Sequence, residues 1–241
     1  MKSWSLHIIC ALLLFMSKTV SAQVNKDAGL WTDYNLTLKY KKKWEFSFAP
    51  EIRFNNNVSQ LSRVMADVGV EYKPIKVFFA GISYRTSTRV EDDWQDTRER
   101  IQFGLGVKHE WRSFTFTLQP RYQASLQQVS SDGDADFETT LRNKLTVKYN
   151  IKKKLSASAS FELFNNSEPG MELRLENWRW KADIGYDLNK RNSFSVGYMI
   201  QKAIYESPQE MDFVFLVSYK TEINLSKKTN KEKENLQPLE K

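Results

Sequence analysis

The stretch WEFSFAPEIRF, residues 44–54, decides how this chain folds. Its apolar side chains alternate with polar or small ones, which is the pattern of a strand with one apolar and one polar face. In a soluble sheet the apolar face packs on a core and the polar face meets water. In a membrane barrel the apolar face meets lipid and the polar face lines the interior. The stretch fits both arrangements, so the rest of the chain must decide between them.

The same pattern recurs in eleven segments. They lie at 28–40, 44–55, 61–72, 77–88, 97–110, 114–127, 138–149, 154–165, 172–187, 192–204 and 211–225. Most exceed the roughly five or six residues of a typical globular strand and reach the roughly 9 to 11 that a membrane-crossing strand needs. After residue 22 no apolar stretch approaches the roughly 20 residues of a spanning helix. The repetition indicates an all-β fold.

The connections between these segments sort by length. Short polar turns follow alternate segments, at 41–43, 73–76, 112–113, 150–153 and 189–192. Longer polar loops, such as VEDDWQD and VSSDGDADF, follow the others. Outer-membrane barrels have this asymmetry, with tight periplasmic turns and longer outer loops. A soluble meander has no reason to sort its loops by side.

Aromatic residues mark both ends of the apolar faces. An aromatic girdle is predicted near the short turns, at Tyr40, Trp44, Tyr72, Phe78, Trp111, Phe114, Tyr149, Tyr186, Phe194 and Tyr219. A second girdle is predicted toward the long loops, at Trp31, Phe54, Tyr84, Phe103, Tyr122, Trp178, Tyr198 and Phe213. Two aromatic belts with smaller aliphatic residues between them are typical of a lipid-facing surface. The alternative is a soluble sandwich whose core is aromatic at its ends.

The opposite face of the segments is charged and rich in arginine. Its basic members are Arg53, Arg63, Arg85, Arg98, Arg100, Arg121, Arg142, Lys144, Arg179 and Lys181, and its acidic members include Glu51, Asp67, Glu162 and Asp183. Arginine pairs bidentately with carboxylates, which suits a narrow barrel interior. If these charges pair and fill the lumen, the barrel is closed. If a gap remains, the excess of basic groups favours anions.

Three basic doublets are the candidates for a selective constriction. They are Arg98 with Arg100, Arg142 with Lys144, and Arg179 with Lys181. Plain salt-bridge packing is the competing interpretation of the same residues. Nucleic-acid binding is not expected despite the formal charge of +7, because the basic residues alternate with apolar ones or sit in turns.

The two ends of the chain differ from the middle. Residues 1–22 have the charged start, apolar run and small-residue cleavage site of a signal peptide, so we expect a mature chain from Gln23. Cys10 would leave with the signal, and no disulfide or thiolate site would remain. The barrel domain is then expected over 23–225, and the charged tail 226–241 is expected to be disordered.

Candidate chemistry is sparse outside the lumen. His109 is the one histidine after the signal, beside a short turn and with lipid-face parity, so a Ser/His lipid-modifying enzyme is a minor alternative. Asp132, Asp134 and Asp136 alternate in a loop that lacks the glutamate of a calcium-binding EF-hand. We interpret that loop as solvated, and expect no metal and no cofactor.

Two features conflict with a simple barrel. Pro50 and Pro120 lie inside predicted strands, where each removes a ladder hydrogen bond, and we expect a bulge near each. Eleven is also an odd number, whereas bacterial single-chain barrels are usually even. A count of ten or eleven remains open, but twelve strands, with residues 23–29 as an added strand, is the preferred prediction.

Three stretches carry a family resemblance: QVNKDAGLW at 23–31, the hairpin with WEFSFAPEIRF, and LRNKLTVKYNIKKKLSASASFELF at 141–164. They resemble a family of uncharacterised outer-membrane β-barrel proteins of Gram-negative bacteria, defined as a domain of unknown function. The resemblance covers about residues 23–225 and implies fold and location without an activity. It implies outer-membrane lipid and the barrel assembly machinery as partners. Because the chain does not end on a terminal aromatic, the assembly signal is expected to be internal.

The sequence therefore predicts a transmembrane, antiparallel up-and-down β-barrel of about 10–12 strands in the outer membrane. No enzymatic activity is expected. A narrow channel for small anionic solutes is the specific hypothesis. The alternatives are a lipid-modifying outer-membrane enzyme and a soluble periplasmic β-barrel or sandwich that binds an apolar ligand.

Overall fold

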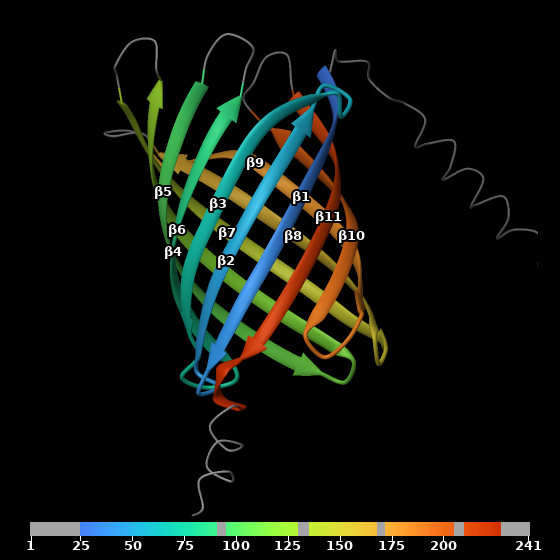
Figure 1. Ribbon diagram of the computed structural model, residues 1–241. Helices are drawn as coiled ribbons and strands as arrows, with labels where there is room; N and C mark the ends of the chain where they lie inside the picture. The colour runs from blue at the N-terminus through green and yellow to red at the C-terminus, as the bar shows by residue number, and fades with distance from the viewer. Residues whose placement is uncertain (1–24, 91–94, 130–134, 168–171, 205–209, 228–241) are drawn as a thin grey trace, which may run out of the picture.

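The computed structural model describes residues 25–90, 95–129, 135–167, 172–204 and 210–227. Eleven strands form one closed barrel (Figure 1). They are β1 (Asn25–Tyr40), β2 (Trp44–Asn55), β3 (Gln60–Tyr72), β4 (Phe78–Val90), β5 (Gln95–Trp111), β6 (Phe114–Val129), β7 (Ala135–Lys152), β8 (Leu155–Ser167), β9 (Arg174–Asp187), β10 (Asn192–Ala203) and β11 (Glu210–Asn224). A short 3-10 helix, η1 (Leu225–Lys227), follows β11. None of the described helical structure has the length and apolar composition needed to cross a bilayer.

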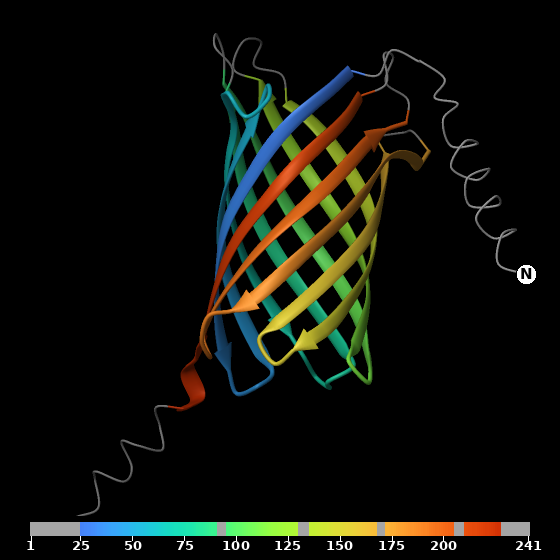
Figure 2. The ribbon, with the colours of Figure 1, turned by 90° about the vertical axis from the view of Figure 1, so that its right-hand side faces the viewer.

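The barrel closes between its first and last strands. Each strand pairs antiparallel with the next, whereas β1 pairs with β11 in parallel (Figure 2). The cause is arithmetic: in an odd-numbered series of alternating strands, the first and last run the same way. Ser218 Oγ donates a hydrogen bond to Asp33 Oδ2 across this seam at 2.7 Å. The all-β barrel is confirmed, but the preference for twelve strands is wrong, because β1 runs unbroken from Asn25 to Tyr40.

The short connections gather at one end of the barrel. The turns after β1, β3, β5, β7 and β9 all lie at the bottom in Figure 1, and we call this end the turn side and the opposite end the loop side. Residues 91–94, 130–134, 168–171 and 205–209 on the loop side fall outside the described residues, as do the predicted signal peptide 1–22 and most of the predicted tail.

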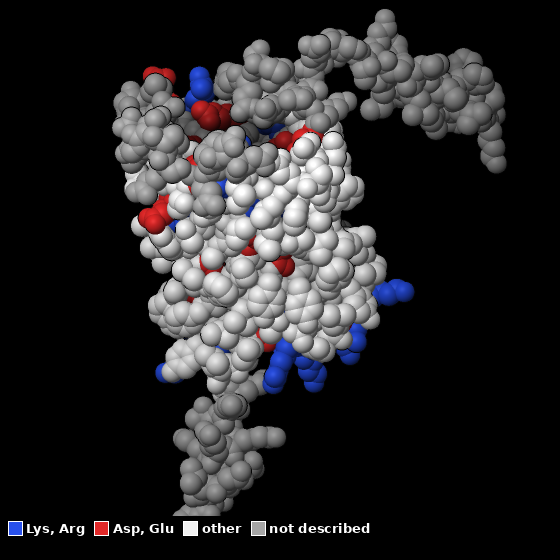
Figure 3. Space-filling model, turned by 45° about the horizontal axis from the view of Figure 1, so that its top comes forward, with Lys and Arg blue, Asp and Glu red and all other residues white. Residues whose placement is uncertain are grey.

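The apolar faces of the strands point outward. In WEFSFAPEIRF, Trp44, Phe46 and Phe48 are 41%, 41% and 44% exposed, whereas the Glu51 and Arg53 side chains are only 15% and 18% exposed. In the view of Figure 3 the barrel wall is mostly uncharged, and Lys and Arg side chains protrude at its lower end. A soluble fold with the apolar residues in its core is therefore wrong, and the surface is that of a membrane barrel.

The aromatic residues near the short turns are neighbours in three runs. The register places Tyr40, Trp44 and Tyr72 side by side on adjacent strands, and the other runs are Trp111, Phe114 and Tyr149, and Tyr186, Phe194 and Tyr219. The Trp44 and Tyr72 ring centroids are 4.6 Å apart. The Phe114 and Tyr149 centroids are 4.8 Å apart. Such cross-strand aromatic pairs stabilise a sheet, and here they form three separate clusters at the turn-side ends of the strands.

Trp31 differs from the predicted second girdle. It lines a cavity inside the barrel and stacks on Arg53, with the guanidinium carbon 3.4 Å from the ring centroid. Its odd position on β1 gives it the parity of Asp33, which also lines the lumen, and not that of the outward Tyr34 and Tyr40. Assigning Trp31 to the lipid-facing surface was therefore an error of parity.

The two strand prolines do not produce the predicted bulges. The β1–β2 ladder omits the pairs opposite Ala49 and Pro50, yet the register is the same on both sides of the gap. The β5–β6 ladder likewise omits the pairs at Gln119 and Pro120 without a shift. Each strand thus loses local pairing and keeps its alternation, because no residue is inserted. The register shifts occur elsewhere, one of them between Arg53 and Phe54.

Glycine makes room for one aromatic ring inside the barrel. A Cβ atom on Gly106 would lie 2.0 Å from Cζ of Phe79 on the adjacent β4. Phe79 therefore depends on the absence of a side chain opposite it, as expected where a strand glycine admits a large neighbour.

Candidate functional site

The lumen holds two cavities that share only Asp33. The loop-side cavity has a volume of about 360 Å³ and is lined by residues from all eleven strands of the barrel. Its charged lining comprises nine basic and four acidic side chains: Arg53, Arg63, Arg85, Arg98, Arg100, Arg142, Lys144, Arg179 and Lys181, against Asp33, Glu51, Glu138 and Glu162. The cavity therefore carries a formal excess of five positive charges.

All six members of the predicted basic doublets line this cavity. Of the other lumen candidates, Arg121 and Asp67 line the second cavity. Asp183 lines neither, and it accepts a hydrogen bond from Ser158 Oγ at 2.8 Å. The alternation of the strands thus brings the predicted residues together in one interior, although it does not by itself assign them a role.

Glu162 holds two arginines together. The residue is 3% exposed. Its Oε1 accepts from Nη2 of Arg142 at 2.8 Å, and its Oε2 lies 3.6 Å from Nη1 of Arg179. The register explains the contact, because Glu162 on β8 lies opposite Lys144 on β7 and Arg179 on β9. One carboxylate therefore bridges two arginines.

Aromatic rings hold several of these guanidinium groups. Phe164 lies 4.6 Å from the guanidinium carbon of Arg142 and 4.8 Å from that of Arg179. Trp31 stacks on Arg53 and lies 5.3 Å from Arg179. A ring face attracts a cation without neutralising it, so the rings help to fix these arginines in position beside their carboxylate partners.

Three basic groups of the loop-side cavity form no ion pair among the residues that the structure describes. They are Arg63, Arg100 and Lys144. Arg100 donates from Nε to Ser125 Oγ at 3.2 Å and lies in the repulsive field of Arg85. By contrast, Arg85 pairs with Asp67 at 2.7 Å. Some basic side chains of the lining are thus neutralised by salt bridges, and others keep a positive charge that no carboxylate compensates.

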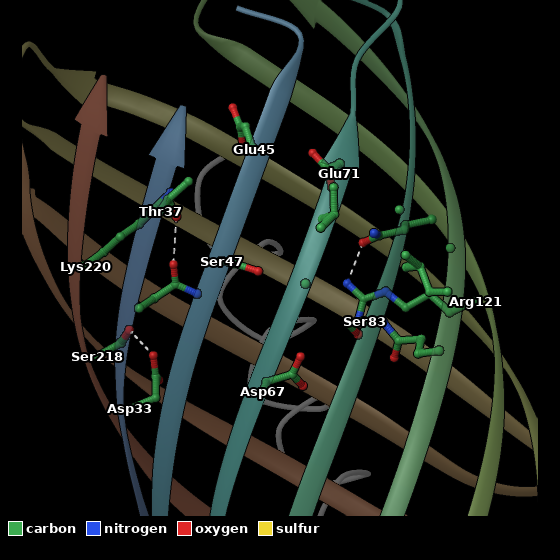
Figure 4. Close-up of a pocket in the computed structure, with 18 residues that line it drawn as sticks. Asp33, Thr37, Glu45, Ser47, Asp67, Glu71, Ser83, Arg121, Ser218 and Lys220 are labelled. Atoms are coloured by element: carbon green, nitrogen blue, oxygen red, sulfur yellow. Dashed lines mark hydrogen bonds between the residues drawn. The ribbon is translucent and has the colours of Figure 1, made fainter. Parts of the chain in front are cut away.

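The turn-side cavity has a volume of about 390 Å³ and a different balance of charge (Figure 4). Four carboxylates line it, Asp33, Glu45, Asp67 and Glu71, against two basic groups, Arg121 and Lys220. Arg121 Nη2 donates to Gln119 Oε1 at 2.5 Å. Its buried Nε has no hydrogen-bond partner among the described residues, so this N–H group is available to donate a hydrogen bond.

Lysines neutralise the carboxylates at the turn-side rim. Lys73 Nζ lies 2.8 Å from Glu45 and 3.1 Å from Glu71. Burial lowers the pKa of Lys73, but its hydrogen bonds and attraction to the two glutamates outweigh burial and raise that pKa above 10.5. Lys39 and Lys220 similarly pair with Glu222, at 2.5 and 2.6 Å.

The remaining candidate chemistry lies away from the lumen or outside the described residues. His109 is exposed at the turn side of β5, opposite Phe116, and no hydrogen bond among the described residues joins it to a serine or a carboxylate. No group of three His, Cys, Asp or Glu side chains that could hold a metal occurs within the described ranges. Asp132 and Asp134 lie outside those ranges.

Sequence reasoning missed the aromatic part of this site. Phe164 was given no role, although it stands two positions after Glu162 and so shares its inward parity. Strict alternation was the available signal for both Phe164 and Trp31. The preference for placing large aromatic residues against lipid obscured it.

Comparisons with known proteins agree with this architecture. No curated protein matches the chain. A solved structure that does match is the beta domain of the Bordetella autotransporter Brka, with a TM-score of 0.50 and 12% identity over 74% of this chain and 82% of that one. At this identity the likeness shows the fold of an outer-membrane-type barrel. The model of a family described as proteins of unknown function, DUF2490, matches residues 28–212, most of the described barrel, so the chain belongs to the DUF2490 family.

Proposed function

We propose that this protein is a narrow outer-membrane channel for small anionic solutes. The observation that carries the proposal is the charge of the loop-side cavity, where nine basic side chains face four acidic ones. Fixed cations on low-dielectric walls concentrate counter-ions, and rings of basic residues make pores select anions. The cavity volume of about 360 Å³ limits the solute to a small molecule.

The charges that would act on a solute are the ones without a carboxylate. Arg63, Arg100 and Lys144 form no ion pair among the described residues, so an entering anion would meet positive charge that is not already satisfied. Salt bridges alone would fill the lumen but would not leave this excess.

The test is ion selectivity in a planar lipid bilayer. We expect the purified barrel to conduct. In a KCl gradient, its reversal potential should lie toward the equilibrium potential of chloride. Arg100→Gln with Lys144→Gln should move the reversal potential toward zero, because two unpaired charges are removed. Lys42→Gln, in the exposed β1–β2 turn, is the matched control and should leave it unchanged. A reversal potential on the potassium side, or no conductance, would contradict the proposal.

A further inference from the structure

A row of basic side chains runs along β7 beyond the loop-side cavity. Arg142 and Lys144 line that cavity, and Lys148 and Lys152 follow at inward or rim positions toward the turn side. At about 3.3 Å per residue, the row extends over about 33 Å of strand. We call these four side chains the basic row. It runs from the loop-side cavity to the turn side on one wall.

The row ends in a third cavity at the turn side. This cavity, the lysine cavity, has a volume of about 490 Å³, and its basic lining is Lys148, Lys152, Lys153 and Lys154. Asp187 is the one carboxylate that lines it. None of the four lysines forms an ion pair among the described residues, whereas Lys39, Lys73, Lys108 and Lys220 at the same end of the barrel all do.

The neighbours of the row are small and carry hydroxyl groups. Lys148 lies opposite Thr115 on β6 and opposite Ser158 on β8, whose hydroxyl already donates to Asp183. Thr146, between Lys144 and Lys148, lies opposite Ser160 and Thr117. Small side chains leave space beside the lysines, and hydroxyl groups can donate hydrogen bonds to an oxygen-rich anion.

The opposite wall has the contrary character. Glu45, Asp67 and Glu71 project from β2 and β3 into the turn-side cavity. Because these carboxylates are paired with Lys73 and Arg85, that wall carries little net charge. The lysines at the turn-side end of β7 form no ion pair among the described residues, so an anion that leaves the loop-side cavity would be attracted to β7. The difference in charge between the two walls therefore favours passage of an anion along the β7 wall.

We infer that β7 and its hydroxyl-bearing neighbours form the turn-side path of the channel, and that the solute is a small oxyanion, with phosphate, sulfate or carboxylate chemistry. The inference rests on the proposed function. Lysine binds such groups as a point charge, and flanking Ser and Thr hydroxyls add donors to the several oxygens of an oxyanion. Several separated binding positions suit conduction, because a solute must be able to leave each one.

Two charge reversals test the path. Lys148→Glu and Lys152→Glu should each shift the reversal potential in a KCl gradient toward the potassium side. Lys42→Glu makes the same change of charge at the exposed turn between β1 and β2, away from the row, and should leave the potential at the wild-type value. Lys148→Gln and Lys152→Gln provide a second series that introduces no negative charge, and should show the same shift at smaller size.

Phosphate block tests the class of solute. Added inorganic phosphate should reduce the chloride current of the wild type and of the Lys42→Glu variant, and reduce it less in Lys148→Glu and Lys148→Gln. Equal block in all four proteins would overturn the assignment of an oxyanion to this wall. A path that runs elsewhere would be shown by an anion-selective wild type in which the Lys148 and Lys152 variants all behave like the control. A wild type without anion selectivity would instead overturn the proposed function, and the path with it.

Discussion

Glu162 shows how a single residue stabilises the lumen. It is the carboxylate partner of both Arg142 and Arg179, and its side chain is 4% exposed. Glu162→Gln should lower the free energy of unfolding by about 3 kcal/mol, because it leaves enclosed guanidinium groups without a compensating charge. Denaturant unfolding of the barrel in detergent would measure this. Glu110→Gln, which breaks the exposed pair with Lys108, is the control and should leave the unfolding midpoint close to the wild-type value. Equal losses would refute the role of Glu162.

Lys73 gives a dependence on alkaline pH. Its pKa is raised above 10.5 in the folded barrel by Glu45 and Glu71, which outweigh its burial. A raised pKa in the folded state contributes stability that is fully present below the unfolded pKa and is lost as pH rises through the folded value. The wild type should therefore be more stable than Lys73→Gln at about pH 8, and the difference should shrink toward pH 12. Unfolding midpoints of both proteins across that range provide the measurement, and a constant difference would be contrary to expectation.

At the scale of elements, the parallel seam between β1 and β11 is the most specific feature. Asp33 and Ser218 contact each other across it at 2.7 Å. A variant with Asp33→Cys and Ser218→Cys should form a disulfide under mild oxidation, since their side chains already touch. Asp33→Cys with Val217→Cys is the control, because Val217 is adjacent to Ser218 and therefore points to the opposite face, so it should not crosslink. Gel mobility before and after reduction reports the result. Failure of the first pair to crosslink would argue for closure through another strand.

At the scale of the whole molecule, closure predicts resistance to SDS. All eleven strands are paired on both sides, so no edge is available at which the ladder can fray. The protein from an outer-membrane fraction should migrate anomalously on an SDS gel when unheated, and shift to its expected mobility after boiling. Identical migration of heated and unheated samples, with recovery in a soluble fraction, would contradict a closed membrane barrel.

Alternation in the sequence determined the strands and the face to which most side chains point. WEFSFAPEIRF fixes an apolar and a charged face by itself, and its repetition with sorted turns made the membrane barrel the better prediction. The reason is local: a strand exchanges faces at every residue, whatever it packs against. The same rule placed the basic doublets in one interior. The same alternation also predicts inward positions for Trp31 and Phe164. These positions were missed because large aromatic residues are usually expected to face the membrane.

Tertiary structure decided closure and pairing, because these depend on residues far apart in the chain. Nothing near Asp33 indicates that it meets Ser218, 185 positions later, and so the parallel seam that lets eleven strands close could not be read locally. Ion pairing is equally non-local. Arg142 and Lys144 look alike in the sequence, yet Arg142 binds Glu162 on β8 while Lys144 forms no ion pair among the described residues. The alternation of a strand gives each charge its face, but only the register and shape of the closed barrel determine which charges are neutralised and which remain to attract an anion.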